Sequence, residues 1–298
     1  MDGFLIVNKP SAMTSYDVIR SLKRLLPRKT KIGHLGTLDP MVTGVLPIAI
    51  GQATKIIPYI EDESKEYVAT LTLGGVSDTQ DVWGNVTYKN SVQIEAEPIE
   101  TALKNLVGDI EQIPPMYSAV HHQGQKLYEL ARKGVIVERK ARPARIFAID
   151  VLQIDLKGQF PLIQFRVVCS KGTYIRTLCN DIGEKLGTGG FLSSLIRTKS
   201  GIFTLDDSHS LAEILAEPED IKGLLAVDFP LKHWPVYRLK DRAESLAISN
   251  GNPIYTTSEL PLGFMRIYDQ EEQFVAIGQA NAENLSVAIK PIRVFKTV

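Results

Sequence analysis

A segment rich in glycine and proline, GHLGTLDPMVTGVLP at residues 33–47, limits what this part of the chain can become. Pro40 disfavours the α conformation at Asp39, and the glycines permit tight turns and close approach by another backbone. The segment therefore predicts a stiff loop that carries one carboxylate, Asp39, at its tip. The alternative is that Asp39 caps a helix with Pro40 at its first position, although Gly44 and Pro47 would leave that helix little room.

Apolar periodicity on both sides of this loop predicts strands and helices. Strands are expected at residues 3–7, 45–50, 67–73 and 161–169, and helices at residues 14–26, 52–60, 125–133 and 173–187. The strand at 67–73 alternates, which places Tyr67, Ala69, Leu71 and Leu73 on one apolar face. With 298 residues and 44% hydrophobic content, the chain can bury a substantial core, and its length suggests a large domain plus a smaller one.

Two segments within this pattern carry charged residues whose role the pattern leaves open. The turn-rich stretch at 74–84 has aspartates that suggest a calcium loop, but Val82 stands where an EF-hand needs an oxygen ligand. We interpret this stretch as a capped loop. Arg176 lies in the first turn of the helix at 173–187, where a positive charge opposes the helix dipole. This position suggests another role for Arg176, such as pairing with a buried carboxylate.

The last sixty or so residues differ from the rest of the chain. Between residues 231 and 239 the pattern changes, and several short strands follow around turn sequences at 251–253 and 260–263. We expect a small β-rich domain at 236–298, after a larger domain at 1–235.

Charge is balanced overall but unevenly distributed. The chain has 34 basic and 34 acidic residues, so no net charge draws it to nucleic acid. Basic residues nevertheless gather at 17–31 and 121–145, where they form either phosphate-binding patches or ordinary solvated helix faces. With Gly124 and Gly134 as hinges, the segment at 119–145 is predicted to be a mobile arm that closes on RNA.

Several functional classes are disfavoured by missing motifs. No Walker loop, dinucleotide fingerprint, nucleophile elbow or CxxC pair is present, and the five histidines lack helical metal-ligand spacing. We therefore expect chemistry by side chains alone, with no cofactor, no nucleotide and no metal. Neither a signal peptide nor a membrane span is recognisable, and Cys169 and Cys179 resemble buried reduced thiols, so we expect a cytoplasmic protein.

Four motifs taken together resemble the bacterial TruB family of tRNA pseudouridine synthases. They are GHLGTLDPMVTGVLP at 33–47, KEY at 65–67, IEQIPPMYSA at 110–119 and CSKGTYIRTL at 169–178. The resemblance covers about residues 3–200, with the motifs in order, and the C-terminal stretch is similar to the PUA-type RNA-binding domain of that family. Val42 stands where the family often has a smaller residue.

The resemblance implies an α+β (mixed α/β) fold, in which a pseudouridine synthase-like mixed sheet with flanking helices precedes a small β-rich PUA-like domain. It also implies isomerisation of uridine 55 in the T-loop of tRNA to pseudouridine, after the target base is flipped out. The expected partner is tRNA, bound by its T-loop and T-stem, with no membrane contact. We expect a monomer.

The residue roles that the resemblance implies concern one pocket. Asp39 is expected to be the essential acid that attacks the ribose or abstracts its proton, and Arg176 is expected to be its ionic partner. Tyr67 would stack on the base and help to remove the C5 proton. The expected substrate-binding residues are His34, which fills the space left by the flipped base, the pocket walls Tyr174 and Leu195, and the arm residues Lys126, Arg132 and Lys133.

Two other functions remain open from the sequence. A non-catalytic RNA-binding or tRNA-folding module would need only the basic patches and the C-terminal domain, with the Asp39 loop as a structural element. A glycosidase would need paired carboxylates across a cleft, and the sequence shows no evident partner acid for Asp39.

Overall fold

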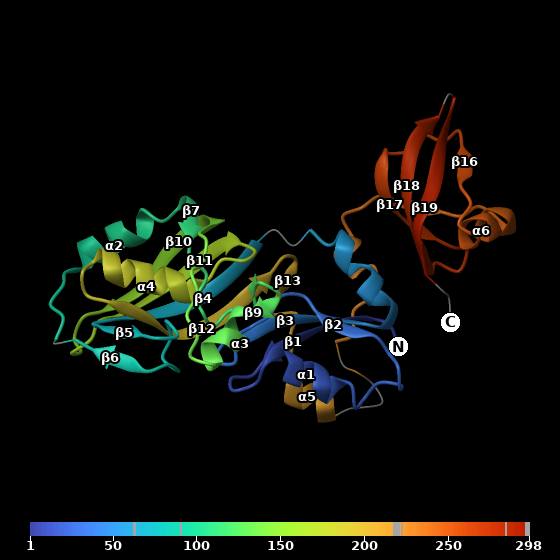
Figure 1. Ribbon diagram of the computed structural model, residues 1–298. Coiled ribbons are helices and arrows are strands. Elements are labelled where there is room, and N and C mark those ends of the chain that lie inside the picture. The colour runs from blue at the N-terminus through green and yellow to red at the C-terminus, as the bar shows by residue number, and fades with distance from the viewer. Residues whose placement is uncertain (62–63, 90, 217–220, 222, 284, 296–298) are drawn as a thin grey trace.

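A ten-stranded mixed sheet forms the larger part of the protein (Figure 1). The computed structural model describes residues 1–61, 64–89, 91–216, 221, 223–283 and 285–295. The main path through the sheet runs β14-β1-β3-β12-β4-β11-β10-β7, while β2 pairs with β3 and β13 with β12. Two pairs, β1 with β14 and β3 with β12, are parallel, and the other strand pairs of this sheet are antiparallel.

The strands of this sheet, in chain order, are β1 (Gly3–Lys9), β2 (Ile32–His34), β3 (Thr43–Ile50), β4 (Ser64–Leu73), β7 (Gly108–Gln112), β10 (Arg142–Asp155), β11 (Leu162–Ser170), β12 (Gly190–Ser200), β13 (Phe203–Thr204) and β14 (His209–Ser210).

Helices flank this sheet, and together they enclose a continuous hydrophobic core. They are α1 (Ser15–Leu22), α2 (Ala96–Lys104), α4 (Ile175–Lys185) and α5 (Leu211–Ala216). Figure 1 shows α1 and α5 beside β1 and β3, whereas α2 and α4 lie at the opposite end, near β10 and β11. One core cluster contains buried apolar side chains from these helices and from the central strands. The predicted mixed sheet with flanking helices is confirmed.

The register of the central strands positions residues that later form the site. In β4, Tyr67, Ala69, Leu71 and Leu73 are buried, as the alternating pattern predicted. Tyr67 lies directly opposite Arg197 of β12 and opposite Val167 of β11. The middle of the sheet therefore fixes the position of Tyr67 from both sides.

Three predicted helices are shorter than expected, or differ in kind. The first helix ends at Leu22 rather than near residue 26, because the chain tightens into three-residue turns before Pro27. Residues 52–60 form two short 3₁₀ segments, η1 (Gly51–Lys55) and η2 (Ile57–Tyr59), the second with a proline in its first turn.

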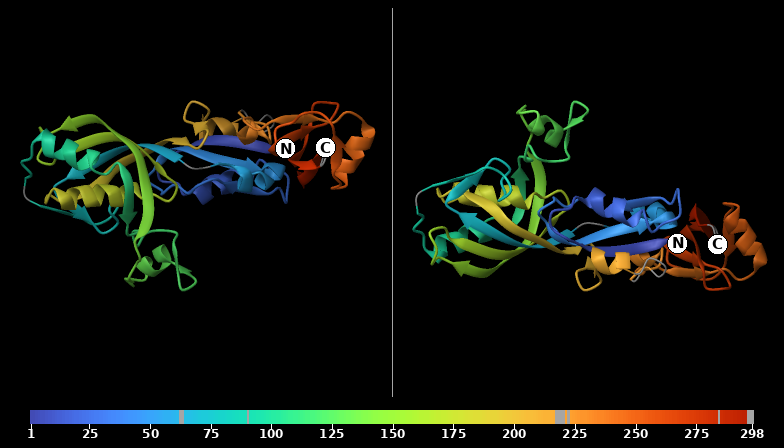
Figure 2. Two further views of the ribbon diagram at one scale, coloured as in Figure 1. Left: turned by 90° about the horizontal axis from the view of Figure 1, so that it is seen from above. Right: turned by 90° about the horizontal axis from the view of Figure 1, so that it is seen from below.

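The predicted helix at 125–133 also needs correction. Its start is instead a strand, β9 (Gln125–Lys126), which pairs with β8 (His121–His122) in a hairpin, so only α3 (Leu127–Arg132) is helical. Both turn residues, Gln123 and Gly124, have positive φ, which is the geometry of a tight two-residue hairpin loop. Figure 2 shows this hairpin and helix projecting from the body of the protein.

The C-terminal residues form a separate five-stranded sheet in the order β15-β17-β18-β19-β16. Its strands are β15 (Val236–Arg238), β16 (Ile254–Thr256), β17 (Gly263–Tyr268), β18 (Phe274–Glu283) and β19 (Ser286–Val294). The predicted β-rich character is confirmed, although the sequence pattern did not reveal helix α6 (Arg242–Ser249). Residues 296–298 of the predicted domain lie outside the described residues.

Aromatic side chains join this second sheet to the larger one. Trp234 stacks on Phe264 of β17 with ring centroids 5.0 Å apart, and Tyr59 of η2 meets both rings edge-on. A second hydrophobic cluster contains Phe4 of β1 together with Phe295 near the C-terminus. The two sheets therefore share an apolar contact rather than only a linker.

Two further observations concern the chain as a whole. Cys169 and Cys179 are buried and free, as predicted. None of the helices in the described part of the chain is both long and apolar enough to cross a membrane.

Candidate active site

The Asp39 loop is a turn rather than the start of a helix. The Val42 N–H donates to the Asp39 carbonyl at 3.0 Å, which closes a four-residue turn with Pro40 at its second position. At Gly44, φ is +101°, and a Cβ there would lie 2.2 Å from the backbone oxygen of Arg197. The alternative of a helix capped by Asp39 is therefore wrong, and the loop passes against β12 too closely for any side chain at residue 44.

Polar side chains from two neighbouring elements secure this loop. Lys9, at the end of β1, is fully buried, and its ammonium donates to the carbonyls of Pro10, Met13 and Pro40 at 2.8, 2.7 and 3.2 Å. Burial lowers the pKa of Lys9 to about 8, and the nearby charge of Asp39 opposes that shift. The Lys9 contact fixes the carbonyl of the residue that directly follows Asp39.

The N-terminal end of α1 makes the second contact to the loop. The hydroxyl of Ser15 donates to the carbonyl of Leu38 at 3.2 Å and accepts from its N–H at 2.9 Å. Helix α1 itself begins with a capping box between Thr14 and Asp17. The residue before Asp39 is thus joined to a well-defined helix terminus.

Arg197 of β12 makes the third set of contacts to the same loop. Its fully buried guanidinium donates from Nε to the Val45 carbonyl at 2.7 Å and from Nη2 to the Gly36 carbonyl at 3.0 Å. It also lies directly opposite Tyr67 in the register of β4 and β12, close enough for its charge to act on the pKa of the tyrosine hydroxyl. One buried cation therefore links both ends of the Asp39 loop to the tyrosine at the centre of the sheet.

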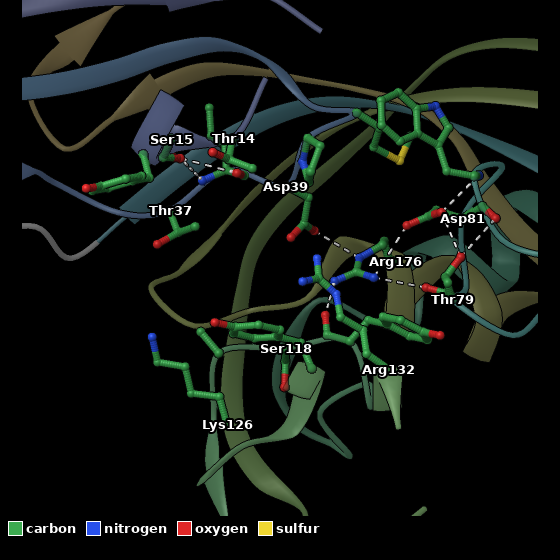
Figure 3. A pocket seen from close by; sticks show the side chains of 18 of the residues that line it. Thr14, Ser15, Thr37, Asp39, Thr79, Asp81, Ser118, Lys126, Arg132 and Arg176 are labelled. Atoms are coloured by element: carbon green, nitrogen blue, oxygen red, sulfur yellow. Dashed lines mark hydrogen bonds and ion pairs between the residues drawn. The ribbon is translucent and has the colours of Figure 1, made fainter. Parts of the chain in front are cut away.

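Arg176, in the first turn of α4, is paired with Asp39, as expected (Figure 3). Its Nε lies 3.0 Å from Asp39 Oδ2. The same guanidinium donates to the carbonyls of Thr79 at 3.0 Å and Tyr117 at 2.8 Å. Its side chain is only 5% exposed, so it joins three segments of the chain out of contact with bulk water.

A second acid, Asp81, meets the same arginine, and the sequence did not reveal it. Its Oδ2 lies 3.4 Å from Arg176 Nη1, while its Oδ1 accepts from the Thr79 hydroxyl and the Trp83 N–H. The stretch interpreted as a capped loop is held against β12 by paired backbone hydrogen bonds to Leu192. The position of Arg176 at a helix N-terminus was the only sequence signal for a carboxylate partner. In the structure it pairs with two carboxylates, those of Asp39 and Asp81.

The environment of Asp39 shifts its protonation equilibrium. Although 42% of the side-chain surface faces an open cavity, protein surrounds the carboxyl closely, and this burial raises its pKa above the usual value. The charge of Arg176 opposes the shift and that of Asp81 adds to it. Asp39 is therefore the accessible member of the two acids, whereas the Asp81 side chain is 9% exposed and fully engaged.

Two cavities meet at Asp39. The first, of about 560 Å³, is lined by residues of α1, by His34 of β2 and by arm residues that include Lys126 and Arg132. The second, of about 390 Å³, is lined by Tyr67, Tyr174 and Leu195. Asp39, Arg176 and Ser118 line both cavities.

The structure thus brings together all but one of the residues expected at the site. The exception is Lys133, which is exposed and lines neither cavity. Lys126 and Arg132 instead face the first cavity and lie over the ring of Tyr128, at 5.7 and 5.4 Å from its centroid. Figure 3 shows both side chains on the side of the pocket that the arm forms, below Asp39 in this view.

Two polar atoms at the cavities have no hydrogen-bond partner among the described residues. They are Nδ1 of His34 and the hydroxyl oxygen of Ser118, both buried. An unpartnered buried polar group costs roughly 1–3 kcal/mol.

Tyr67 lines the second cavity. Burial raises its pKa to about 12, although Arg197 beside it acts in the opposite direction. The phenol therefore stays protonated at neutral pH. It offers an aromatic face and a protonated hydroxyl near the guanidinium of Arg197.

The arrangement can hold a planar ring against Tyr67 while a carboxylate acts at its edge. The second cavity is apolar at Tyr67 and Leu195, and it opens onto Asp39. In the part of the chain that the structure describes, no group of three His, Cys, Asp or Glu side chains could hold a metal ion. The chemistry that this geometry supports is nucleophilic or basic attack by one carboxylate held by an arginine.

Comparison with known protein families identifies matches over most of the chain. Residues 23–175 match the N-terminal domain of the TruB family of pseudouridylate synthases. Residues 176–225 match the C-terminal domain of tRNA pseudouridylate synthase B, and residues 239–295 match the C-terminal domain described for pseudouridine synthase II TruB.

Individual proteins are similar over nearly their whole length. The tRNA pseudouridine synthase B of Syntrophomonas wolfei is 52% identical over 297 residues, covering 99% of each chain. That of Alkaliphilus oremlandii is 44% identical over 291 residues, covering 95% of each. Among solved structures, a chain in a Cbf5-Nop10-Gar1 complex superposes with a TM-score of 0.69 at 28% identity, covering 99% of this chain and 85% of that one. A chain in an H/ACA ribonucleoprotein bound to a substrate RNA containing 2′-deoxyuridine has the same TM-score at 25% identity, with the same coverage.

Proposed function

The chain belongs to the TruB family of tRNA pseudouridine synthases, and we propose that it isomerises uridine 55 in the T-loop of tRNA to pseudouridine. The enzyme is an isomerase. In the proposed reaction, the bond between N1 of uracil and C1′ of ribose breaks and a bond from C5 to C1′ forms. The C5 proton is lost and N1 gains one, so atoms balance without an oxidant or reductant.

One observation carries this proposal: the Asp39 carboxylate lies on a buried arginine at the meeting point of two cavities. We assign Asp39 as the essential acid that attacks the ribose or abstracts its proton. Arg176 favours the ionised form of Asp39 and holds its orientation, which offsets part of the effect of burial. Asp81 in turn fixes Arg176, and only 9% of its own side chain is exposed.

The second cavity is the proposed site of the flipped base. A base within a folded loop must leave its stack before its glycosidic bond can be reached, which costs roughly a few kcal/mol. Stacking on Tyr67, between the apolar walls Tyr174 and Leu195, recovers part of that cost. The raised pKa of Tyr67 favours stacking and hydrogen bonding over removal of the C5 proton by its phenol.

The first cavity is the proposed site of the RNA chain around the target. Lys126 and Arg132 face it from the arm at 119–145, where they are placed to contact phosphates. His34 lines the same cavity, which fits an occupant of the space that the flipped base leaves. We assign Lys133 only a peripheral contact, because it lines neither cavity.

The remaining assignments concern the whole protein. We propose that residues 1–235 are the catalytic domain and residues 236–298 a PUA-like domain that contacts tRNA away from the reacting base. The stacking of Trp234 on Phe264 joins the two domains, which supports a fixed spacing between the reacting base and the tRNA contact of the PUA-like domain. We further propose that the protein acts as a monomer in the cytoplasm.

The test is conversion of a defined uridine by the purified protein. A T-arm hairpin and full-length tRNA are incubated with the protein, and the modified position is mapped by its altered reactivity to carbodiimide at unchanged RNA mass. Conversion is expected at the position of uridine 55 and nowhere else in the hairpin. A hairpin with cytidine at that position is the control. Tight binding without conversion of either RNA would favour a binding module instead.

A further inference from the structure

Two exposed aromatic side chains, Tyr16 and Trp83, stand at the rim of the first cavity. Tyr16 is 64% exposed and Trp83 is 55% exposed, and both line the cavity that contains Asp39. Among the described residues, no aromatic ring packs on either of them and no cation lies over either ring. Tyr128 in the same cavity differs, because Lys126 and Arg132 lie over its ring. The two rings at the rim are therefore free to accept a planar ligand.

The backbone of each of these residues is fixed to the catalytic loop. Tyr16 follows Ser15, whose hydroxyl both donates to and accepts from the backbone of Leu38. The N–H of Trp83 donates at 3.0 Å to Asp81. Asp81 is joined to Asp39 through Arg176.

These two anchoring points lie on opposite sides of the catalytic acid. Figure 3 shows Ser15 and Asp81 on either side of Asp39. Exposed rings on anchored backbones present area for contact at a small cost in conformational entropy. Their spacing relative to Asp39 is set by the same contacts that set the catalytic site.

The surroundings favour nucleotides as the occupants of these rings. Lys126 and Arg132, both from the arm, supply positive charge to the same cavity. Unpaired RNA bases are typically recognised by stacking on aromatic side chains beside cations that bind the phosphates. A base that leaves its stack also exposes the faces of its two neighbours to water.

We propose that Tyr16 and Trp83 stack on the nucleotides that flank the extruded uridine, one on each side. This assignment rests on the proposed function and goes beyond it by adding a second binding site, for unstacked neighbouring bases. The two rings replace the stacking that the neighbours lose when the target base enters the second cavity. They therefore help to hold the RNA loop open.

Tryptophan fluorescence tests the assignment without relying on catalysis. The chain has two tryptophans, and the other, Trp234, is stacked on Phe264 where the two sheets meet. Titration with a T-arm hairpin RNA should quench the fluorescence of the wild type, because a base stacked on Trp83 quenches its indole. Trp83→Phe should keep affinity within about threefold but lose that quenching, since phenylalanine retains an aromatic face.

Affinity measurements provide the second readout. Base stacking on an aromatic side chain contributes enough that Trp83→Ala and Tyr16→Ala should each weaken hairpin binding roughly 5- to 100-fold. Phe147→Ala is the matched control, because Phe147 is 46% exposed but lines neither cavity, and it should leave affinity unchanged. An RNA with an abasic residue beside the target uridine lacks one of the two neighbouring bases. The ring that stacks on that base, Tyr16 or Trp83, should then lose much of its contribution, so its alanine substitution should weaken binding much less.

The outcomes separate this inference from the proposed function. If the wild type shows no quenching, or both alanine variants bind as tightly as the control while the wild type still isomerises uridine, the stacking assignment is overturned and the proposed function stands. If the wild type neither binds nor isomerises the RNA, both are overturned.

Discussion

Replacement of Arg176 by methionine tests how the buried guanidinium supports the site. Methionine keeps the length and apolar stem of the side chain but removes every N–H donor. Asp81, whose side chain is 9% exposed, then loses its cation, and the carbonyls of Thr79 and Tyr117 lose their donor. Removal of one partner from a buried ion pair costs about 3–5 kcal/mol, and we expect a loss of unfolding free energy in this range.

The two acids should respond differently when each is neutralised in the Arg176→Met protein. Asp81→Asn removes the deeply buried charge and keeps an oxygen for the Trp83 N–H, so it should restore roughly half of the lost stability. Asp39→Asn should restore less, because 42% of the Asp39 side chain already faces water. All variants that lack the arginine should be nearly inactive.

Urea unfolding supplies the measurement, with the midpoint and slope compared across the wild type, Arg176→Met and the two double variants. Equal slopes are needed for the midpoints to report stability. A loss below about 1 kcal/mol for Arg176→Met would refute the argument that this pair is buried and coupled. A larger rescue by Asp39→Asn than by Asp81→Asn would refute the assignment of the buried charge to Asp81.

Three further predictions concern pH, salt and backbone geometry. Since Asp39 acts as a carboxylate, activity should fall as the pH drops through its raised pKa. The acid limb of the pH profile of kcat/KM should therefore lie above the ordinary aspartate pKa of about 3.9. Asp81→Asn removes a negative charge that raises the pKa of Asp39, so it should move this acid limb to lower pH. Arg132→Ala should reduce the slope of log affinity against log salt by roughly 0.9 if Arg132 contacts duplex-like RNA, or by roughly 0.7 if the RNA is single-stranded. Lys133→Ala should change this slope little. Equal slopes for Arg132→Ala and the wild type would show that Arg132 contacts no phosphate. Gly44→Ala should lower activity and should destabilise the protein by more than about 1 kcal/mol in urea unfolding, because its Cβ would lie 2.2 Å from a backbone oxygen of β12. A variant as stable as the wild type would contradict the observed path of the loop.

Local sequence chemistry was sufficient for the main elements and for the loop that carries the acid. Alternation at 67–73 predicted the buried strand with Tyr67, and the Asp39–Pro40 pair predicted a turn that carries a carboxylate. Both features depend on neighbours in the chain. The unfavourable position of Arg176 at a helix N-terminus also indicated that it pairs with a carboxylate, as it does with Asp39.

Features that depend on long-range contacts could not be predicted in this way. Asp81 lies in a polar turn-rich stretch, and only pairing of that stretch with β12 buries it beside Arg176. The segment at 125–133 has helical periodicity, yet the positive φ angles at Gln123 and Gly124 turn its first residues into a hairpin. Arg197 gave no local signal, because its contacts are carbonyls of the Asp39 loop and of β3 and a tyrosine of β4, all distant in sequence.

Conversion and binding measured together for Asp39→Asn test the central claim most directly. Asparagine keeps the shape of the side chain but removes the charge and the reactive oxygen, while the proposed RNA contacts lie elsewhere. Pseudouridine formation in a T-arm hairpin should therefore disappear, and affinity should stay within about tenfold of the wild type, roughly 1.4 kcal/mol. Substantial pseudouridine formation by a clean Asp39→Asn preparation would contradict the assignment of Asp39 as the essential acid.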